Sequence, residues 1–368
     1  MTANAHDSSA TQNPTAATAS AGPDATDAGA AEVARQIAAI GDGDYVVRGI
    51  TKDGLVRAFA TTTRRTVQAA RDAHTTSPVV TAALGRLLTC GAMMGSLLKD
   101  PEELFTFIVR GDGPIGGLTV TADAHGHVKG YAANPDVWIP LSAAGKLDVG
   151  TAVGKGSLTV IQDVPWGEPY TSQLNLVSGE IGDDMAAYFV ESEQIPTSVG
   201  VGVLVDTDLS VKQAGGFIIQ LMPGYTEETV ERLEASLRGV KSVTAMLEEG
   251  MTPLDMLRHA LGGLDFEPLE ASPVSFHCNC SRERTSRVLY ALGTKELQDL
   301  VHEGKPVELV CNFCNSAYTF GVDEVEKILA EARAHATGAQ GADGAGDTGD
   351  TGNTRTSDGA GDVTIEQE

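Results

Sequence analysis

The sequence predicts an α+β protein: an N-terminal core domain of β-sheets with packed helices, a helical linker, and a small C-terminal four-cysteine domain. Between residues 44 and 224, strand-like and helix-like segments are grouped instead of alternating regularly, which is typical of α+β folds. Short helices interrupted by glycine follow over 225–263, and four of the 5 cysteines then stand in two close pairs. The length of 368 residues also favours more than one domain.

The elements of the core domain are expected in a definite order. Residues 44–63 alternate apolar and polar side chains about a Lys-Asp-Gly turn, which predicts a β-hairpin. Residues 78–99 have helical apolar spacing, with Pro78 near the start. The remaining elements are strands within 104–133, 157–164 and 170–177, a helix over 182–198 that breaks at Pro196, and a hairpin over 199–224.

The linker is expected to be helical and marginally stable. Thr252 and Pro253 are typical of an N-cap and a first helical residue, and Gly239 and Gly250 interrupt the pattern. One apolar stripe runs along the linker: Val230, Leu233, Leu237 and Val240. Helices this short need packing against another surface, so the order of the linker should depend on its neighbours.

The two ends of the chain have compositions that do not favour a packed structure. The first 35 residues are mostly Ala, Thr, Ser and Asp, and the chain after about residue 337 is rich in Gly, Asp and Thr. We therefore expect five segments: a disordered tail over 1–43, the core domain over 44–224, the linker over 225–272, the small four-cysteine domain over 273–325, and a short helix followed by a disordered acidic tail over 326–368.

The charge and the apolar runs exclude several classes of partner. The net charge is −24, and a surface this acidic repels phosphate backbones, so we expect no nucleic-acid partner. No apolar run is long enough to cross a bilayer, and the N-terminus lacks the pattern of a signal peptide. We expect a cytoplasmic protein with no membrane partner. In that reducing compartment, close cysteine pairs indicate metal or redox chemistry more than structural disulfides.

The cysteine pairs are the strongest functional signal. Cys278 and Cys280 lie in "FHCNCSRER", and Cys311 and Cys314 lie in "VCNFC". Two such pairs offer four thiolates to one tetrahedral ion, and zinc accepts four sulfur ligands in closed structural sites. The sequence therefore predicts one Zn²⁺ per chain, bound by all four cysteines.

The residues around the pairs leave the role of the metal open. His277 and His302 could replace a sulfur ligand, but four cysteines already complete the coordination shell. Three arginines follow the first pair and either favour the thiolate form or lie on a solvated surface: Arg282, Arg284 and Arg287. The metal is either a permanent structural element or part of a redox switch, because zinc-bound sulfur is thiolate, the form that oxidants attack.

Other motifs carry no chemistry. The stretch "GTAVGKGS" at 150–157 has three residues, not four, between its first two glycines, and Gly follows Lys where a phosphate loop needs Ser or Thr. Cys90 lies in an apolar helical run and is expected to be a core residue. No arrangement typical of a catalytic triad stands out, so we expect no enzyme activity.

With these residues, the sequence resembles the heat-shock protein thirty-three family of bacterial redox-regulated holdase chaperones. The two cysteine motifs carry the resemblance, in particular the Ser-Arg-Glu-Arg after the first pair. Three further stretches stand in the expected order: "GDGP" at 111–114, "YFVESEQIPT" at 188–197 and "AGGFIIQLMP" at 214–223. The similarity covers roughly residues 44 to 325.

The resemblance implies a mechanism that spacing alone does not. When the family members are reduced, the cysteines hold zinc and the monomeric chaperone is inactive. Oxidants then form disulfides between near neighbours, here Cys278–Cys280 and Cys311–Cys314, and zinc leaves. The small domain unfolds, the linker loosens, the protein dimerises, and unfolding client proteins are held without ATP. Losing a structural metal should indeed unfold a small domain, since metal binding energy is folding energy.

Two other functional classes compete with this interpretation. One is a zinc-ribbon binding module with a purely structural metal, which would be indifferent to peroxide. The other is a thiol oxidoreductase that uses "CNFC" as a redox pair; the absence of a thioredoxin-like βαβ pattern around it argues against this class.

Overall fold

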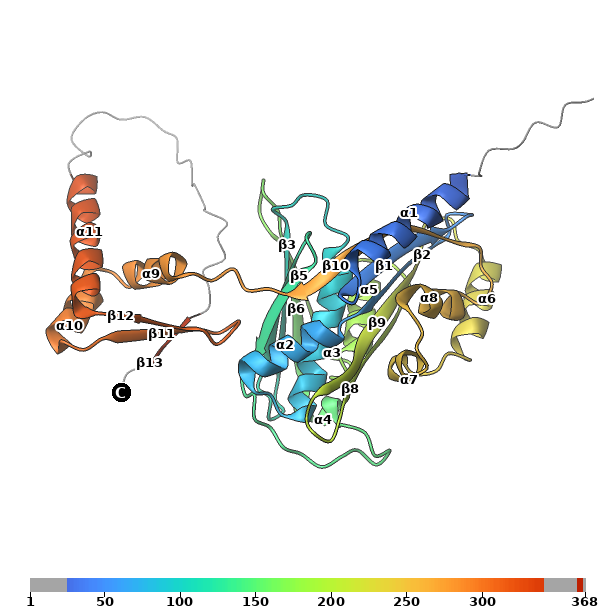
Figure 1. Cartoon of the computed structure of the whole chain (residues 1–368), viewed down its shortest axis with the longest axis horizontal. Helices are drawn as coiled ribbons and strands as arrows, with labels where there is room; N and C mark the ends of the chain where they lie inside the picture. Colours follow the sequence, from blue (N-terminus) through green and yellow to red (C-terminus); the bar gives the residue numbers. More distant parts are fainter. Residues whose placement is uncertain (1–24, 341–362, 367–368) are drawn as a thin grey trace, which may run out of the picture.

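The fold is that of a computed structural model that describes residues 25–340 and 363–366 (Figure 1). A large sheet with helices on both faces forms the core, and a smaller module containing the cysteines lies beside it. The α+β prediction with a C-terminal four-cysteine domain is confirmed. The expectations for residues 1–24 and 341–362 lie outside the described residues.

The core sheet has ten strands in the order β7-β6-β3-β4-β5-β10-β1-β2-β9-β8. Neighbouring strands are antiparallel except for β10 and β5, which pair in parallel over two residues only. Both expected hairpins are present, β1–β2 and β8–β9. The strands are β1 (Asp44–Thr51), β2 (Val56–Thr62), β3 (Leu104–Gly111), β4 (Leu118–Asp123), β5 (His127–Ala132), β6 (Gly156–Asp163), β7 (Tyr170–Asn175), β8 (Thr197–Val205), β9 (Val211–Leu221) and β10 (Phe266–Phe276).

One face of the sheet packs on the central helix α3 (Pro78–Gly95), together with α2 (Arg64–His74), α4 (Val149–Val153) and α5 (Gly182–Glu191). Contrary to the expectation from the sequence, helix α3 is long and apolar enough to span a membrane by length and composition, but 89% of it is buried inside the protein, as in the core helix of a folded domain. The expectation for Cys90 is confirmed, because it is fully buried on α3 and burial raises its thiol pKa to about 12. The helix α5 ends before the expected limit of 198, at Glu191.

The linker helices cover the other face of the sheet. Side chains along one strand alternate between the two faces: Val46 of β1 joins the α3 side, and Val47 joins the linker side. The linker comprises α6 (Glu227–Leu237), α7 (Val243–Glu248) and α8 (Pro253–Leu261). The predicted cap is confirmed, since Thr252 accepts a hydrogen bond from the amide of Asp255 and Pro253 begins α8.

The expected linker stripe also packs on this face. Leu233 is buried, and the other three members are partly buried against the same hydrophobic cluster. Gly239 and Gly250 both lie between helices, as their positions in the sequence indicated. The order of these short helices therefore comes from the sheet beneath them.

The expected boundaries were wrong at two places around the core. Residues 25–40, expected to be part of a disordered tail, form helix α1 (Ala25–Ile40), in which Val33 is buried. Alanine favours helix, and a few apolar side chains at helical spacing suffice when a sheet lies beneath them. The expected boundary at 272/273 falls inside β10, which belongs to the core sheet. Pro268 and Pro273 lie in this segment, and proline disfavours a strand that is paired on both sides. Most of β10, however, pairs with a neighbouring strand on one side only.

The cysteine module has its own small core, made of side chains such as Leu289, Leu309 and Phe320. Its elements are α9 (Arg282–Ala291), α10 (Thr294–Glu303), β11 (Val307–Cys311), β12 (Ala317–Phe320) and α11 (Val322–Gln340). The expected helix after residue 325 is present as α11, although it begins earlier, at Val322; in the expected disordered tail, the described residues 363–366 instead form a strand. Apolar residues of α11 pack into the module core, and β13 (Val363–Glu366) pairs with β11.

Candidate metal centre

The four predicted cysteines meet at one point of the module. Cys278 and Cys280 follow the end of β10, whereas Cys311 ends β11 and Cys314 lies in the turn before β12. Their Sγ atoms all lie within 4.8 Å of one another, although the two pairs are far apart in the sequence. Two sulfur–sulfur contacts join the pairs: 3.7 Å from Cys278 to Cys311 and 3.3 Å from Cys280 to Cys314.

Backbone hydrogen bonds shape the second pair into a tight turn. The amides of Cys314 and Asn315 both donate to the carbonyl of Cys311, and the amide of Cys311 donates to the carbonyl of Ser316. Asn315 takes a left-handed conformation with φ of 57°, which Asn tolerates better than most residues. On the other side, Ser281 caps α9 by accepting from the amide of Arg284, so that the first pair lies immediately before a helix.

The arrangement suits a tetrahedral metal ion. With zinc–sulfur bonds of about 2.3 Å, the edges of the tetrahedron are about 3.8 Å long. The sulfur–sulfur distances of 3.3 and 3.7 Å are close to this value, and no two of the four sulfurs lie more than 4.8 Å apart. Among the described residues, no other group of His, Cys, Asp or Glu lies together in this way. These cysteines can therefore hold one metal ion, which when bound would cross-link the two halves of the module.

The electrostatics show how the thiols share protons without an ion. A hydrogen bond from Cys278 lowers the pKa of Cys311 to about 5, and the same bond holds the pKa of Cys278 above its usual value. Burial raises the pKa of Cys280. A proton thus links one thiol to one thiolate across the two motifs. A cation at the centre of the four sulfurs would take over this role.

Two hydroxyl groups that sequence reasoning missed also contact the sulfurs. The hydroxyl of Tyr318 lies 3.1 Å from Sγ of Cys280, and this contact raises the pKa of Tyr318. The hydroxyl of Ser316 lies 3.2 Å from Sγ of Cys314. Both residues stand just after the second pair, so their nearness in sequence was the available signal.

The histidines and arginines near the motifs have other roles. The ring of His277 stacks on that of His127 at 4.5 Å, and His302 bonds to the carbonyl of Gln298 within α10. Neither lies in the group of side chains that could hold a metal ion. Arg282 pairs with Glu324 at 2.9 Å and lies over the ring of Phe320, so it ties α9 to the rest of the module. Arg284 and Arg287 are exposed on the same helix.

The turn that carries Cys311 and Cys314 contacts the core domain directly through Phe313. Only 8% of the surface of Phe313 is exposed. Its ring packs edge-on against Tyr131 at 5.4 Å and lies under the ammonium group of Lys129 at 4.6 Å. His74 of α2 bonds to the Phe313 carbonyl at 3.1 Å. We call His74, Lys129 and Tyr131 the Phe313 socket.

The first cysteine pair touches the same socket. Lys129 also donates a hydrogen bond of 2.9 Å to the side chain of Asn279, which stands between Cys278 and Cys280. Each motif thus contacts the core domain through the residues between its cysteines. No sequence pattern pointed to this socket, because α2 and β5 are far from the cysteines along the chain.

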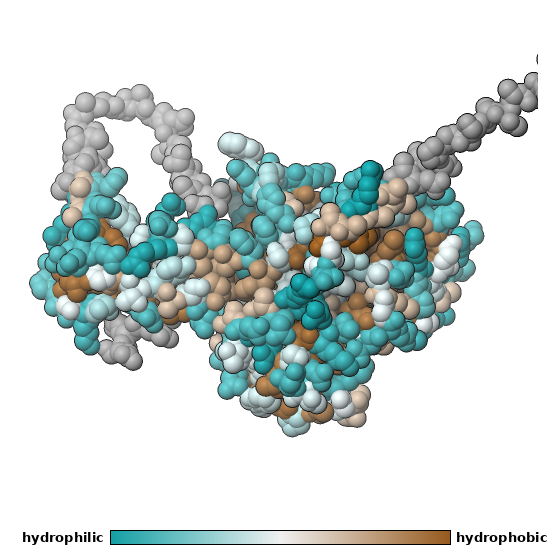
Figure 2. All heavy atoms as spheres, viewed as in Figure 1, coloured by the Kyte–Doolittle hydropathy of each residue, from teal (hydrophilic) through white to brown (hydrophobic). Residues whose placement is uncertain are grey.

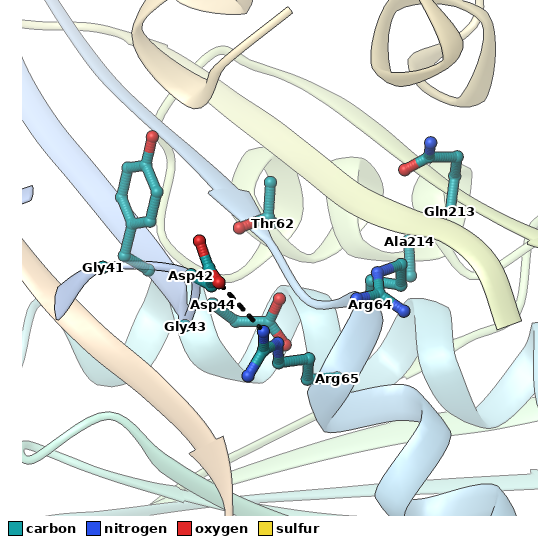
Figure 3. Close-up of a pocket in the computed structure, with 10 residues that line it drawn as sticks. Gly41, Asp42, Gly43, Asp44, Thr62, Arg64, Arg65, Gln213 and Ala214 are labelled. Carbon is teal, nitrogen blue, oxygen red and sulfur yellow. Dashed lines mark ion pairs between the residues drawn. The ribbon is translucent and has the colours of Figure 1, made fainter. Parts of the chain in front are cut away.

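A surface pocket lies apart from the metal centre, where β1 begins and α2 starts (Figure 3). Asp44 accepts hydrogen bonds from the amide and the hydroxyl of Thr66, at 2.7 and 2.8 Å. Asp42 pairs with Arg65 at 3.8 Å. Burial raises the pKa of Asp44, and its contacts are those of a helix cap. The pocket is therefore explained by the start of α2 and is not a second functional site.

The comparisons with known proteins agree with this architecture. The family model described as Hsp33 protein matches residues 44–321. A 33 kDa chaperonin of Agathobacter rectalis is 51% identical over 285 residues, which are 77% of this chain and 99% of that protein. A 33 kDa chaperonin of Geobacillus kaustophilus is 48% identical over 287 residues, 78% of this chain and 97% of that protein.

A solved structure is similar as well. The crystal structure of a 33 kDa chaperonin from Thermotoga maritima, described as a heat shock protein 33 homolog, has a TM-score of 0.73 and 37% sequence identity. The similarity covers 78% of this chain and 98% of that one.

Proposed function

Because this chain belongs to the Hsp33 family of chaperones, we propose that it is a redox-regulated, ATP-independent holdase whose switch is the four-cysteine centre. One observation carries the proposal: the sulfurs of Cys278, Cys280, Cys311 and Cys314 meet within 4.8 Å while the turn that holds two of them packs against the core domain. A chemical change at the sulfurs therefore acts on a contact between domains.

In the reduced state the centre binds one Zn²⁺ through all four cysteines, and the chain is an inactive monomer. The donor set supports zinc, since four thiolates in a closed tetrahedron are typical of structural zinc sites. Cys311 and Cys314, when they hold the ion, would fix the turn at 311–314 and keep Phe313 in its socket. Zinc-bound thiolates persist in a reducing compartment, in agreement with a cytoplasmic location.

Oxidation removes the ligands from the metal. Two molecules of peroxide accept four electrons from the four thiolates, so that two disulfides form and Zn²⁺ is released; four protons from the solvent join the peroxide oxygens, and four molecules of water result. Following the family resemblance, the disulfides are Cys278–Cys280 and Cys311–Cys314. The cross-pairs, at 3.7 and 3.3 Å, are the alternative, and peptide mapping of the oxidised chain distinguishes the two.

Loss of the metal then destabilises the linker in two steps. Without the ion, the small module loses the binding energy that folds it, and Phe313 leaves the socket. The strand β10 connects the linker to Cys278, so disorder in the module reaches the end of that strand. The linker helices are short and depend on packing, and their release uncovers the apolar face of β1, β2 and β9.

The uncovered face is the proposed binding surface for unfolding client proteins. It includes Val47, Ala58 and Ile219, which the linker keeps buried in the resting chain. Exposed apolar surface of this extent also favours self-association, so the active form is a homodimer. Binding needs no nucleotide and no catalytic residue, in line with relatives that are named chaperonins.

The test is a paired measurement on the full chain, reduced and after mild peroxide. The reduced chain should contain about one zinc per four-sulfur site and should not prevent the aggregation of a thermally unfolding client. The oxidised chain should lack zinc and prevent aggregation. A chain that keeps its zinc in peroxide and never holds client would instead be a zinc module with a purely structural metal.

A further inference from the structure

Helix α1 presents one apolar stripe toward the core domain. Val33 is 1% exposed, and Ile37 and Ile40 are partly buried against the same hydrophobic cluster. Gln36 lies on this side too, whereas Ala34 and Ala38 are exposed. The spacing of Val33, Ile37 and Ile40 is that of an amphipathic helix bound to a surface.

The stripe covers the same face of the sheet as the linker helices. Val33 shares its hydrophobic cluster with Tyr45 of β1, with Ala271 of β10 and with Met256 of the linker helix α8. Figure 1 shows α1 lying along β1 and β10, and in Figure 2 hydrophobic residues gather beside it. Helix α1 therefore extends the linker layer across the part of the sheet that α6–α8 leave uncovered.

Helix α1 also covers a strand edge. One side of β10 pairs with β1 over residues 266–274, but the other side pairs with β5 only at Ser275 and Phe276. On that open side the amide of Ala271 donates a hydrogen bond of 2.8 Å to the side chain of Gln36. A side chain at Gly29 would come within 3.9 Å of the carbonyl of Pro268. An open edge of this kind is a natural docking place for another chain segment.

Helix α1 lies outside the part of the chain that matches the family model, which begins at residue 44. A glycine-containing connection, Gly41 to Gly43, joins α1 to β1, and Gly41 has a φ of 66°. A released α1 would thus stay tethered next to its binding place and rebind without diffusing away. The contact is small enough to open, since Val33 is the one fully buried side chain among the described side chains of α1.

We propose that Tyr45, Phe266 and Ala271, with the open edge of β10, form a binding strip for amphipathic segments of unfolding clients, and that α1 occupies this strip in the resting chain. This inference rests on the proposed chaperone function and adds to it. A client segment that binds this strip should resemble α1. It needs apolar side chains at positions i, i+4 and i+7, and an amide or similar oxygen that accepts a hydrogen bond from the amide of Ala271. Release of α1 therefore adds client surface beyond that uncovered by the linker.

The test compares two double variants of the full chain in the reduced, zinc-loaded state. Val33→Asp with Ile37→Asp charges the buried stripe, and Ala34→Asp with Ala38→Asp places the same charges on the exposed side of the same helix. We expect the first variant to exchange the Ala271 amide at least tenfold faster than wild type, because an opened helix no longer protects its hydrogen bond. The second variant should behave as wild type.

Binding is measured with a labelled synthetic peptide of residues 25–40. The peptide should bind the stripe variant, not the wild-type or control chain, and a client should displace it. The reduced stripe variant should also slow client aggregation partially. If the double substitution unfolds the chain, Gln36→Ala removes only the hydrogen bond to Ala271, and it should give the same pattern with a smaller increase in exchange.

Two results separate this inference from the proposed function. If oxidised wild type holds client but the opened stripe variant binds neither peptide nor client, α1 is only a structural cover and the inference is wrong. If oxidised wild type holds no client, the chaperone proposal fails. Peptide binding that no client displaces would likewise overturn the strip as a client site.

Discussion

The Nε2 atom of His74 lies 3.1 Å from the carbonyl oxygen of Phe313, so a helix of the core domain is hydrogen-bonded to the turn that carries Cys311 and Cys314. Lys129 and Tyr131 contact the ring of Phe313 as well. The four-cysteine site is therefore part of an interface between the cysteine module and the core domain, which we call the joint.

Phe313→Ala should leave the metal site intact and weaken the joint. All four cysteines remain, so the zinc content should not change. Removing a buried phenyl ring should cost on the order of 3 kcal/mol of docking free energy. The variant should therefore become active at lower peroxide than wild type, as measured by client light scattering. Tyr290→Ala, which removes a more exposed aromatic ring from the same module, is the control. An unchanged peroxide dependence of Phe313→Ala would exclude the socket from the switch.

The burial of His74 predicts that docking of the cysteine turn at this joint depends on pH. Burial lowers the pKa of His74 below its ordinary value of 6.5, so the docked state favours the neutral ring. The released state binds the proton more readily, and docking is therefore complete above about pH 6.5 and weakens as the pH falls below it. His74→Gln keeps a hydrogen-bond donor but does not titrate. Wild type should lose more thermal stability than His74→Gln between pH 7 and pH 5.5; equal losses would contradict the assignment.

Zinc binding should release fewer than four protons at pH 7. The raised pKa values of Cys278 and Cys280 mean that both thiols release a proton to the solvent when the metal binds, whereas Cys311, with a pKa of about 5, is already thiolate. Zinc affinity should fall as the pH falls, most steeply below about pH 5, where Cys311 also binds a proton. Calorimetry in buffers of different ionisation enthalpy counts the protons. Release of four protons per zinc at pH 7 would refute the shared-proton arrangement.

Leu233→Glu should open the linker while zinc stays bound. Leu233 is buried against the sheet, and replacing it with a carboxylate should cost roughly 2–5 kcal/mol of linker packing. We expect cleavage within 225–263 by limited proteolysis and partial client holding in the reduced state. Ala235→Glu adds the same group at an exposed position of α6 and should have no effect. A reduced Leu233→Glu chain that keeps its zinc and its folded core, yet holds no more client than wild type, would exclude the linker as the gate.

Local patterns predicted the parts of the protein that depend on local physics. The β1–β2 hairpin follows from alternation about one turn, α8 from the Thr252–Pro253 cap, and the metal centre from four cysteines in two close pairs. In each case the decisive residues are neighbours in the sequence. The linker stripe at Leu233 was recognisable for the same reason, although the surface beneath it was not.

The parts that were missed depend on contacts between distant segments. Pro268 and Pro273 disfavour a strand, yet β10 forms because one side of it needs no strand partner. Helix α1 has only three large apolar side chains, Val33, Ile37 and Ile40, and it is ordered by β10, which lies far along the chain. The Phe313 socket joins α2, β5 and the second cysteine pair, and no spacing rule connects these segments.

The central claim is that holding activity begins when the four sulfurs release their metal. The most direct measurement adds peroxide to the reduced, zinc-loaded chain and follows three signals in one time course: zinc captured by a coloured chelator, disulfides identified by mass spectrometry, and light scattering by an aggregating client. Zinc release and formation of the Cys278–Cys280 and Cys311–Cys314 disulfides should proceed together, and light scattering by the client should fall at the same time or directly afterwards. Client holding that reaches its full extent while zinc remains bound to all four cysteines would contradict the claim.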